Sequence, residues 1–409
     1  MKKLFCIYLS IFLFTTAHDN VPFKLGVENI PIDFLTTSCP TKKPQECMIG
    51  LITNQTGVDQ KGARTADILA QNGYTIKYIF APEHGLNGTL AERDVLDSVD
   101  AKTNIPILSL YGNGSGKMIA PEHINDLDVL VFDIQDSGMR HYTYISTLLN
   151  TMKIAADYHK PYIVLDRPNP LGSRMAGPLV EPSLISFISI APIPLRHGMT
   201  IGEIALYFNK HVCSKPAQLQ VIKMENYDRN VGFMGNFIHQ LSPNLQSLQS
   251  CYGYSFLGLM GEVEPFDVGV STPMAFRCIA LPKSMRVPKN VWKKVQALFK
   301  EYGVKSVFYK HINPKNKKKS KGLRLEFNNI SQLKSFELFI ELLQLFKKEN
   351  ISFSFSAAFN KAVGTAKVQE VIAGTLGKDL FFAQIKSELE EFCKRAQGMF
   401  LYAPVPVIH

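Results

Sequence analysis

Short apolar, β-rich runs alternate with stretches of helical length through the first half of this chain, and this alternation restricts the folds available to it. The strand-like runs are 48–53, 75–80, 105–110, 128–134 and 162–165. Residues 65–72 and 142–158 have helical length and periodicity, and Thr200 with Glu203 has the spacing of a capping box that opens a helix. Buried strands that alternate with helices form a parallel sheet covered on both faces. The sequence therefore predicts an α/β fold.

The second half has a different organisation. A chain of 409 residues exceeds what one hydrophobic core usually supports, so more than one domain is expected. We predict a parallel-sheet domain over 18–225 and a smaller α/β domain over 226–409. The elements expected in the second domain are strands at 269–282 and 323–327 and helices at 288–302, 332–348 and 380–395. The lysine-rich stretch 315–321 predicts an exposed loop.

The N-terminus has the pattern of a secretory signal peptide. Lys2 and Lys3 precede an apolar run over 4–14, and small residues then lead to a plausible cleavage site before His18. The run is shorter than the roughly 20 residues that span a bilayer. We predict a signal peptide over 1–17 and export to the periplasm or the medium; a buried N-terminal strand or helix is the alternative. No other segment reaches transmembrane length, so no integral membrane segment is expected in the mature chain.

The net charge of the chain indicates which kinds of partner it could bind. The formal net charge is +10, which permits an anionic partner. The lysine run at 315–321 has no interleaved aromatic residues of the kind that line single-strand nucleic-acid grooves, so no nucleic-acid partner is predicted. Cys39 and Cys47 could close a small loop, or they could be free buried thiols.

Polar residues follow each predicted strand of the first half. In a parallel sheet the carboxyl ends of the strands share one edge, where ligands bind. Carboxylates, amides and arginines there suit a polyhydroxyl ligand and acid/base chemistry. The strand-end residues are Asn54, Gln55, Glu83, His84, Tyr111, Asp133, Gln135, Asp136, Arg140, Asp166, Arg167 and Asn169.

Glu83 is the first candidate for a catalytic acid. Cleavage of a glycoside needs a carboxylic acid that protonates the leaving oxygen, and Glu83 lies on a short turn between Pro82 and His84. The alternative is a surface glutamate paired with His84. Asp133 and Asp136 could act as second carboxylate, base or orienting group, and Asp133 could instead cap the following turn.

The sequence lacks the motifs of nucleotide-binding, esterase and zinc sites. The stretch 112–117 resembles a phosphate-binding loop, but Tyr111 and Met118 stand where that motif needs Gly and Ser or Thr. No G-x-G-x-x-G opens a predicted helix, and neither G-x-S-x-G nor H-E-x-x-H occurs. The sequence therefore predicts neither a cofactor nor a metal.

Seven short blocks are distributed along the chain. They are G-L-I-T-N-Q-T-G at 50–57, A-P-E-H-G at 81–85, V-F-D-I-Q-D at 131–136, Arg140 with Y-T-Y at 142–144, D-R-P-N-P at 166–170, P-L-R-H-G-M-T at 194–200 and F-N-K-A-V-G-T at 359–365. In this order they resemble one family, the NamZ-type exo-β-N-acetylmuramidases, which were long a domain of unknown function. The resemblance covers nearly the whole mature chain.

The resemblance implies a Rossmann-like N-terminal domain without a nucleotide, a smaller C-terminal domain and a groove between them. It implies release of terminal N-acetylmuramic acid from peptidoglycan fragments in cell-wall turnover or recycling. The family's P-E-H-G glutamate, which is proposed to be catalytic, falls on Glu83, with His84 beside it. Arg140, Arg167 or Arg196 would hold the lactyl carboxylate. The substrate-binding residues implied or chosen in this way are Asn54, Gln55, Arg140, Tyr142, Asp166, Arg167, Asn169, Arg196 and His197.

One block departs from the family pattern. A glycine–arginine–glycine segment, followed by Thr, Arg-Pro-Phe and Glu, is typical of the family's C-terminal domain, whereas residues 267–276 read D-V-G-V-S-T-P-M-A-F. The arginines and the glutamate are missing there. The alternative function is therefore a catalytically inactive peptidoglycan- or sugar-binding protein with the same fold.

Overall fold

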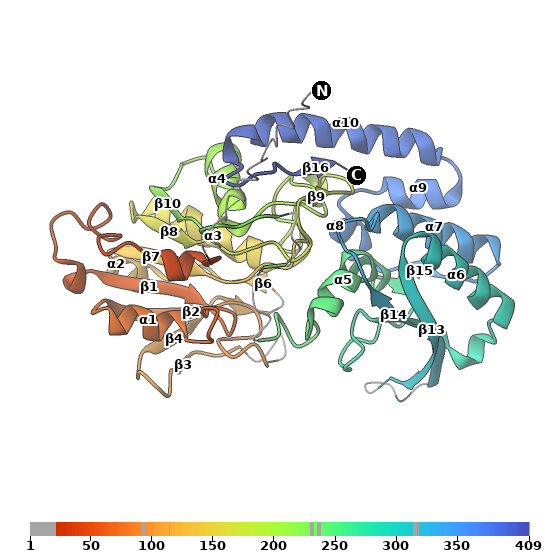
Figure 1. Ribbon diagram of the computed structural model, residues 1–409, viewed down its shortest axis with the longest axis horizontal. Helices are drawn as coiled ribbons and strands as arrows, with labels where there is room; N and C mark the ends of the chain where they lie inside the picture. Colours follow the sequence, from red (N-terminus) through yellow and green to blue (C-terminus); the bar gives the residue numbers. More distant parts are fainter. Residues whose placement is uncertain are drawn as a thin grey trace, which may run out of the picture.

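The computed structural model describes residues 22–90, 95–113, 115–229, 233–234, 239–313, 317 and 319–408. The predicted signal peptide, residues 1–17, lies outside the described residues. The predicted α/β class is confirmed, because helices surround a seven-stranded, mostly parallel sheet (Figure 1).

The central sheet has neighbouring strands that run parallel, except for the antiparallel pair β3–β4. Its order is β10 (Leu219–Ile222), β8 (Tyr162–Leu165), β7 (Val129–Asp133), β1 (Met48–Thr53), β2 (Thr75–Ala81), β4 (Pro106–Ser109) and β3 (Ser98–Val99). Thr53 is in register with Asp133, so the carboxyl ends of β1 and β7 are level. The strand ends predicted to share one edge therefore do so.

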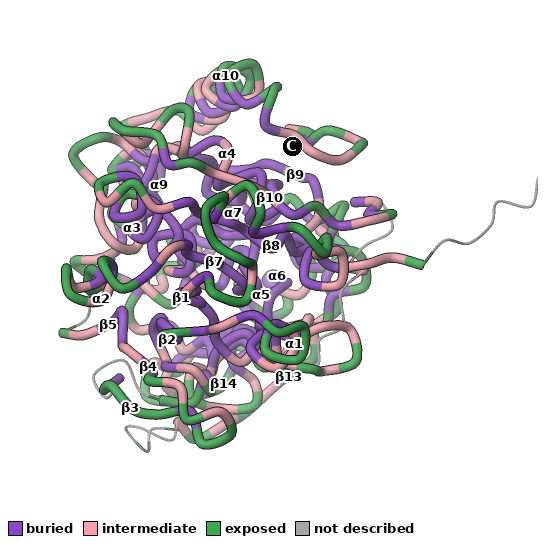
Figure 2. The backbone as a smooth tube through the Cα atoms, turned by 90° about the vertical axis from the view of Figure 1, so that its left-hand side faces the viewer, coloured by how far each residue is buried: buried purple, intermediate pink, exposed green. Residues whose placement is uncertain are grey.

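Alternating side chains of these strands enter two different cores, which accounts for their continuously apolar sequences. Leu51 and Val131 pack in one cluster with α1 (Thr65–Gln71) and the N-terminal residues around Leu35. Residues such as Phe132 and Val164 pack in the other with α3 (Tyr144–Asp157) and α4 (Ile201–His211). Figure 2 shows the central strands buried between these coverings. Thr200 caps α4 as predicted, since its side chain accepts from the Glu203 amide and the box is complete.

The second half contains a smaller antiparallel sheet. Its order is β12 (Cys278–Pro282), β14 (Lys319–Phe327) and β13 (Val304–Ile312). The helices α5 (Leu248–Met260) and α6 (Lys289–Glu301) pack against it, and α7 (Ser335–Lys348) packs against both of these helices. The long helix α10 (Lys378–Ala396) crosses the top of both sheets in Figure 1. One continuous cluster of buried apolar side chains includes residues from both halves, and the boundary at 225/226 stays a prediction.

Two expectations for the second half were wrong in part. Residues 269–276 form turns rather than a strand, because Gly269 has a φ of +78° and Thr272 and Ala275 donate backbone hydrogen bonds three residues back. Lys319 and Lys321 belong to β14 rather than to a loop, although they are exposed as predicted. Lys317 is exposed and lies outside the strands, and residues 315, 316 and 318 are outside the described part of the chain. The alternating polar residues of β13 concealed that strand, because it lies at the sheet edge and much of it is exposed.

The remaining elements are short. The strands and α-helices are β5 (Tyr111–Gly112), β6 (Ser115–Gly116), α2 (Pro121–Asn125), β9 (Arg174–Met175), β11 (Val263–Glu264), β15 (Ser354–Phe355), α8 (Phe359–Val363), α9 (Lys367–Ala373) and β16 (Val407–Ile408). The 3₁₀ turns are Gly26–Asn29, Pro44–Glu46, Pro182–Leu184, Lys283–Met285 and Gln397–Met399. Cys39 and Cys47 form a disulfide. Among the described residues, no helix has the length and apolarity needed to cross a membrane.

Candidate active site

A cavity of about 190 Å³ lies beyond the carboxyl end of β2, where parts of both halves meet. The turn after β2 contributes Glu83 and His84, and the segment before α3 supplies further side chains. The opposite wall comes from α5 and the turns on either side of it. The lining residues are Glu83, His84, His141, Tyr142, Thr143, Tyr144, Ile188, Ser242, Asn244, Leu245, Tyr254 and Phe276.

Glu83 is held at this cavity by its neighbours. It is only 8% exposed, and its Oε2 accepts a hydrogen bond from the Thr143 hydroxyl. The Tyr144 hydroxyl donates to the Glu83 carbonyl at 3.3 Å. His84, at a φ of +71°, places its Nδ1 3.0 Å from the Leu90 carbonyl oxygen. The carboxyl group is thus oriented by the start of α3.

Three further predicted residues hold the wall of the cavity in place; of these, Tyr142 lines the cavity, whereas Asn54 and Gln55 do not. Gln55 Nε2 donates to the carbonyls of Gln240 and Leu241, at 2.9 and 3.1 Å. The Tyr142 hydroxyl donates to the same Leu241 carbonyl at 2.8 Å. Asn54 Oδ1 accepts from the Thr56 amide at 2.9 Å, which closes the turn after β1. These bonds fasten the segment before α5 to the edge of the sheet.

Aromatic residues form a side of the cavity that was not predicted. The ring centroids of His141 and Tyr254 lie 4.6 Å apart, and those of Tyr254 and Phe276 lie 4.8 Å apart. Neither ring nitrogen of His141 has a hydrogen-bond partner among the described groups. Burial, with the charge of Arg140, lowers the pKa of His141 to about 3, so this imidazole is neutral at physiological pH. The block at 140–144 contained His141 and Thr143, but their place at the cavity depends on the turn into α3.

Asp133, at the carboxyl end of β7, belongs to a buried ion pair. It is fully buried, and its carboxylate accepts from Arg167 Nε and Nη2, the latter at 2.7 Å, and from the Thr65 hydroxyl. Arg167 Nη2 also donates to the Val58 carbonyl at 2.9 Å. The pair joins β7, β8 and the start of α1, and neither partner lines the cavity.

A second internal network contains Asp136. Its Oδ2 accepts from the Gly138 amide at 2.6 Å and lies 3.0 Å from His197 Nε2. Asn169 Nδ2 donates to the Met199 carbonyl at 2.9 Å. These side chains hold the loops after β7 and β8 together.

Arg140 and Arg196 fasten the second half of the chain to the first. Arg140 donates to the carbonyls of Pro178, Ile193 and Val363 at 2.7–2.8 Å, and the adjacent Gly364 leaves room for it, because a Cβ there would lie 2.3 Å from Nη2. Arg196 donates to the Leu171, Leu333 and Ile330 carbonyls. Burial lowers the pKa of each guanidinium to about 9. The structure therefore brings neither arginine to the cavity.

Asp166 connects the C-terminal segment to the central sheet. It is fully buried and accepts from the hydroxyls of Tyr402 and Thr200 at 2.7 and 2.9 Å, and from the Gly202 amide at 2.8 Å. Desolvation outweighs these bonds and raises the pKa of Asp166 from 3.8 to about 6.

This shift predicts a pH-dependent stability. Because the folded state binds the Asp166 proton more tightly, the stabilisation is complete below pH 4 and is lost as the pH rises through about 6. The shift corresponds to roughly 3 kcal/mol. We expect the free energy of unfolding, measured with urea at a series of pH values, to fall over this range, and to fall much less in Asp166→Asn. Identical pH dependences for the two proteins would contradict the assignment.

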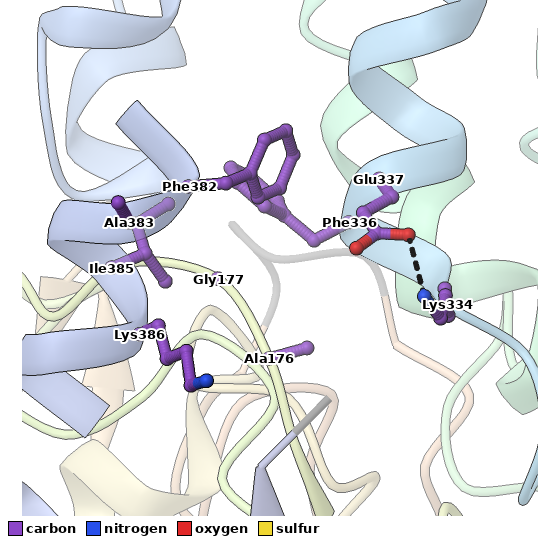
Figure 3. A pocket seen from close by; sticks show the side chains of 9 residues that line it. All are labelled: Ala176, Gly177, Lys334, Phe336, Glu337, Phe382, Ala383, Ile385 and Lys386. Carbon is purple, nitrogen blue, oxygen red and sulfur yellow. Dashed lines mark ion pairs between the residues drawn. The ribbon is translucent and has the colours of Figure 1, made fainter. Parts of the chain in front are cut away.

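A second cavity, of about 230 Å³, lies between α10, α7 and residues 176–177 (Figure 3). Phe336 and Phe382 approach it from the two helices, and its charged side chains include Lys334 and Glu337, whose charged groups lie 3.4 Å apart. None of the predicted site residues lines it. In the part of the chain that the structure describes, no cluster of His, Cys, Asp and Glu could hold a metal ion.

Comparison with known proteins gives consistent matches. Residues 49–249 match the family model described as exo-β-N-acetylmuramidase NamZ, N-terminal, and residues 252–402 match its C-terminal counterpart. The chain is 32% identical over 366 residues to the peptidoglycan β-N-acetylmuramidase NamZ of Bacillus subtilis (strain 168), covering 87% of this chain and 86% of that protein.

Two solved structures are also similar. Both are crystal structures of DUF1343 family proteins from Bacteroides fragilis NCTC 9343, and each alignment covers 93% of this chain and 99% of the other. Their TM-scores are 0.78 and 0.71, at 27% and 26% sequence identity.

Proposed function

Because the chain belongs to the NamZ family of exo-β-N-acetylmuramidases, we propose that it releases terminal N-acetylmuramic acid from peptidoglycan fragments, with Glu83 as general acid. The family makes it a glycosidase that acts on peptidoglycan. The observation that carries the catalytic assignment is the position of Glu83, which is buried, oriented by Thr143 and part of the cavity wall.

The cavity offers two kinds of contact to a sugar. The rings of Tyr254 and Phe276 present apolar surface against which the CH face of a pyranose can pack. Asn244, Ser242 and Thr143 offer polar side chains for hydroxyl and acetamido groups. Phe276 belongs to the stretch that departs from the family pattern, so this departure lies at the substrate cavity and would influence which sugars are accepted.

In this proposal Asp133 and Asp136 support the site without lining the cavity. Both are buried in networks that hold loops at the sheet edge, and their contacts are with Arg167 and His197. Glu83 is the carboxylate that the described cavity lining contains. Arg167 is proposed to act through Asp133, and Arg140 and Arg196 through the packing of the two halves against each other.

The function is tested with chromogenic glycosides. The purified chain is expected to release the chromophore from a β-glycoside of N-acetylmuramic acid faster than from the matching N-acetylglucosamine glycoside. Binding of muropeptides with no turnover of either glycoside would favour the inactive sugar-binding alternative. Export and a part in cell-wall turnover or recycling remain proposals, based on the pattern at 1–17 and on the family's substrate.

Thr143 is expected to position Glu83 rather than to contact the reacting bond. Thr143→Val removes the hydroxyl that donates to Glu83 Oε2, so the carboxyl loses its orientation. We expect kcat to fall roughly tenfold, within the effect of one lost hydrogen bond, with little change in KM. Thr143→Ser keeps the hydroxyl and should restore most of kcat. A Ser variant as impaired as the Val variant would show that the hydroxyl is not what matters.

A further inference from the structure

The end of the β13–β14 hairpin carries apolar and basic side chains on one face. Phe308 pairs with Leu323, Lys310 with Lys321 and Ile312 with Lys319, and residues directly opposite each other in an antiparallel pair share a face. Phe308 is 50% exposed and Ile312 57% exposed. The Lys289 ammonium lies 5.5 Å from the centre of the Phe308 ring. We define the hairpin patch as Lys289, Phe308, Lys310, Ile312, Lys319 and Lys321.

The lysines of the hairpin patch have no acidic partner. Among the described residues, no ion pair includes any of them, although all four are exposed. Lys310 and Lys321 also stand directly opposite each other, and like charges in that position destabilise a sheet. The arrangement costs stability within the isolated chain, and an external anionic partner would offset that cost.

Protection of an edge strand does not account for the whole patch. Lysines on an exposed edge discourage pairing with other chains, and Lys310 lies on the edge strand β13. Lys319 and Lys321, however, are on β14, which is the central strand of this sheet. Edge protection also gives no reason for two large apolar side chains to be exposed between the lysines.

We propose that the hairpin patch docks on the surface of an anionic lipid bilayer. Lysines near such a surface are attracted by its negative potential. Phe308 and Ile312 would enter the boundary between headgroups and acyl chains, as the apolar side chains of interfacial proteins do. A soluble polyanion would neutralise the lysines but would leave both apolar side chains in water. The combination therefore favours a bilayer.

The patch is separate from the cavity. None of its residues lines the cavity that contains Glu83. In Figure 1 the β13–β14 hairpin extends to the lower edge of the molecule, away from the central sheet. Docking through this hairpin would hold the enzyme at a membrane while its cavity stays open, so changes in the patch should not alter hydrolysis of a small soluble glycoside.

The test is co-sedimentation with vesicles, using the chain from residue 18 onward in every case. We expect binding to vesicles of equal parts phosphatidylcholine and phosphatidylglycerol, and little binding to phosphatidylcholine alone. Lys310→Gln/Lys321→Gln should bind the anionic vesicles roughly 30-fold more weakly. The control Lys43→Gln/Lys61→Gln removes the same charge from exposed lysines of the N-terminal half and should change binding by about threefold or less.

A second variant separates a bilayer from a soluble polyanion. Ile312→Ser should weaken binding to anionic vesicles by roughly tenfold but leave binding to polyphosphate unchanged. Glycoside hydrolysis should match wild type in each variant, and Lys310→Gln/Lys321→Gln should be at least as stable as wild type in thermal unfolding, because the opposed like charges are removed. Equal binding to neutral and anionic vesicles, an equal loss in the control pair, or an Ile312→Ser protein that binds vesicles as wild type does would each overturn the proposal.

Discussion

Glu83→Gln is expected to lower kcat/KM for muropeptide hydrolysis by roughly 10²- to 10⁴-fold, the range of general acid catalysis. Glutamine has the shape of the native side chain, and its amide oxygen can still accept the hydrogen bond from Thr143. It cannot deliver a proton to the leaving oxygen. The cavity should therefore still bind the sugar, so that KM changes little while kcat falls.

Leaving-group dependence makes this test specific for the acid role. An activated nitrophenolate departs with little protonation, whereas a sugar hydroxyl needs it. The defect of Glu83→Gln should accordingly be much smaller with a nitrophenyl glycoside than with a natural disaccharide. Equal losses on both substrates would point away from a general acid. Glu122→Gln, an exposed glutamate on α2, is the matched control and should hydrolyse both substrates as wild type does.

Asp133→Asn is expected to destabilise the protein by about 3–5 kcal/mol, since it leaves the buried Arg167 charge without its partner. Arg167 would retain its bond to the Val58 carbonyl, but the bidentate contact with a carboxylate would be lost. Urea unfolding at neutral pH measures the change. We expect this loss of stability to be the main effect of Asp133→Asn, with only a minor change in the activity of the molecules that remain folded.

The exposed pair of Arg324 and Glu326 provides the comparison. Their side chains are 43% and 51% exposed and 3.4 Å apart, so Glu326→Gln should cost less than about 1 kcal/mol. An Asp133→Asn protein with wild-type stability and no activity would show instead that Asp133 takes part in the reaction. The two outcomes separate a supporting carboxylate from a catalytic one.

Much of the first half could be predicted from its sequence. The strand at 48–53 and the capped helix after Thr200 follow from local signals, namely a continuous apolar run and a capping box. The second half was harder. The edge strand β13 has no apolar run longer than three residues, because much of it is exposed. Residues 269–276 include apolar side chains, but they form consecutive turns.

Only part of the candidate site could be predicted from the positions of residues at strand ends. Such reasoning gives the edge of the sheet on which a residue lies, but not the direction of its side chain. Glu83 leaves its turn toward the cavity, whereas Asp133, at the end of β7, points to Arg167 in the interior. His141, Tyr254 and Phe276 come from three separate segments, and no local pattern relates them.

The sequence by itself determined the parallel sheet, the edge that carries the polar residues and the family. These properties follow from periodicity and from short ordered blocks, which are local. Only the tertiary structure decided which polar residues face the cavity and which are buried supports. The physical reason is desolvation, because a charged side chain can be buried only where protein groups replace its hydration. Arg140, Arg167 and Arg196 are each surrounded by carbonyl or carboxylate oxygens from distant segments, which only the folded chain brings together.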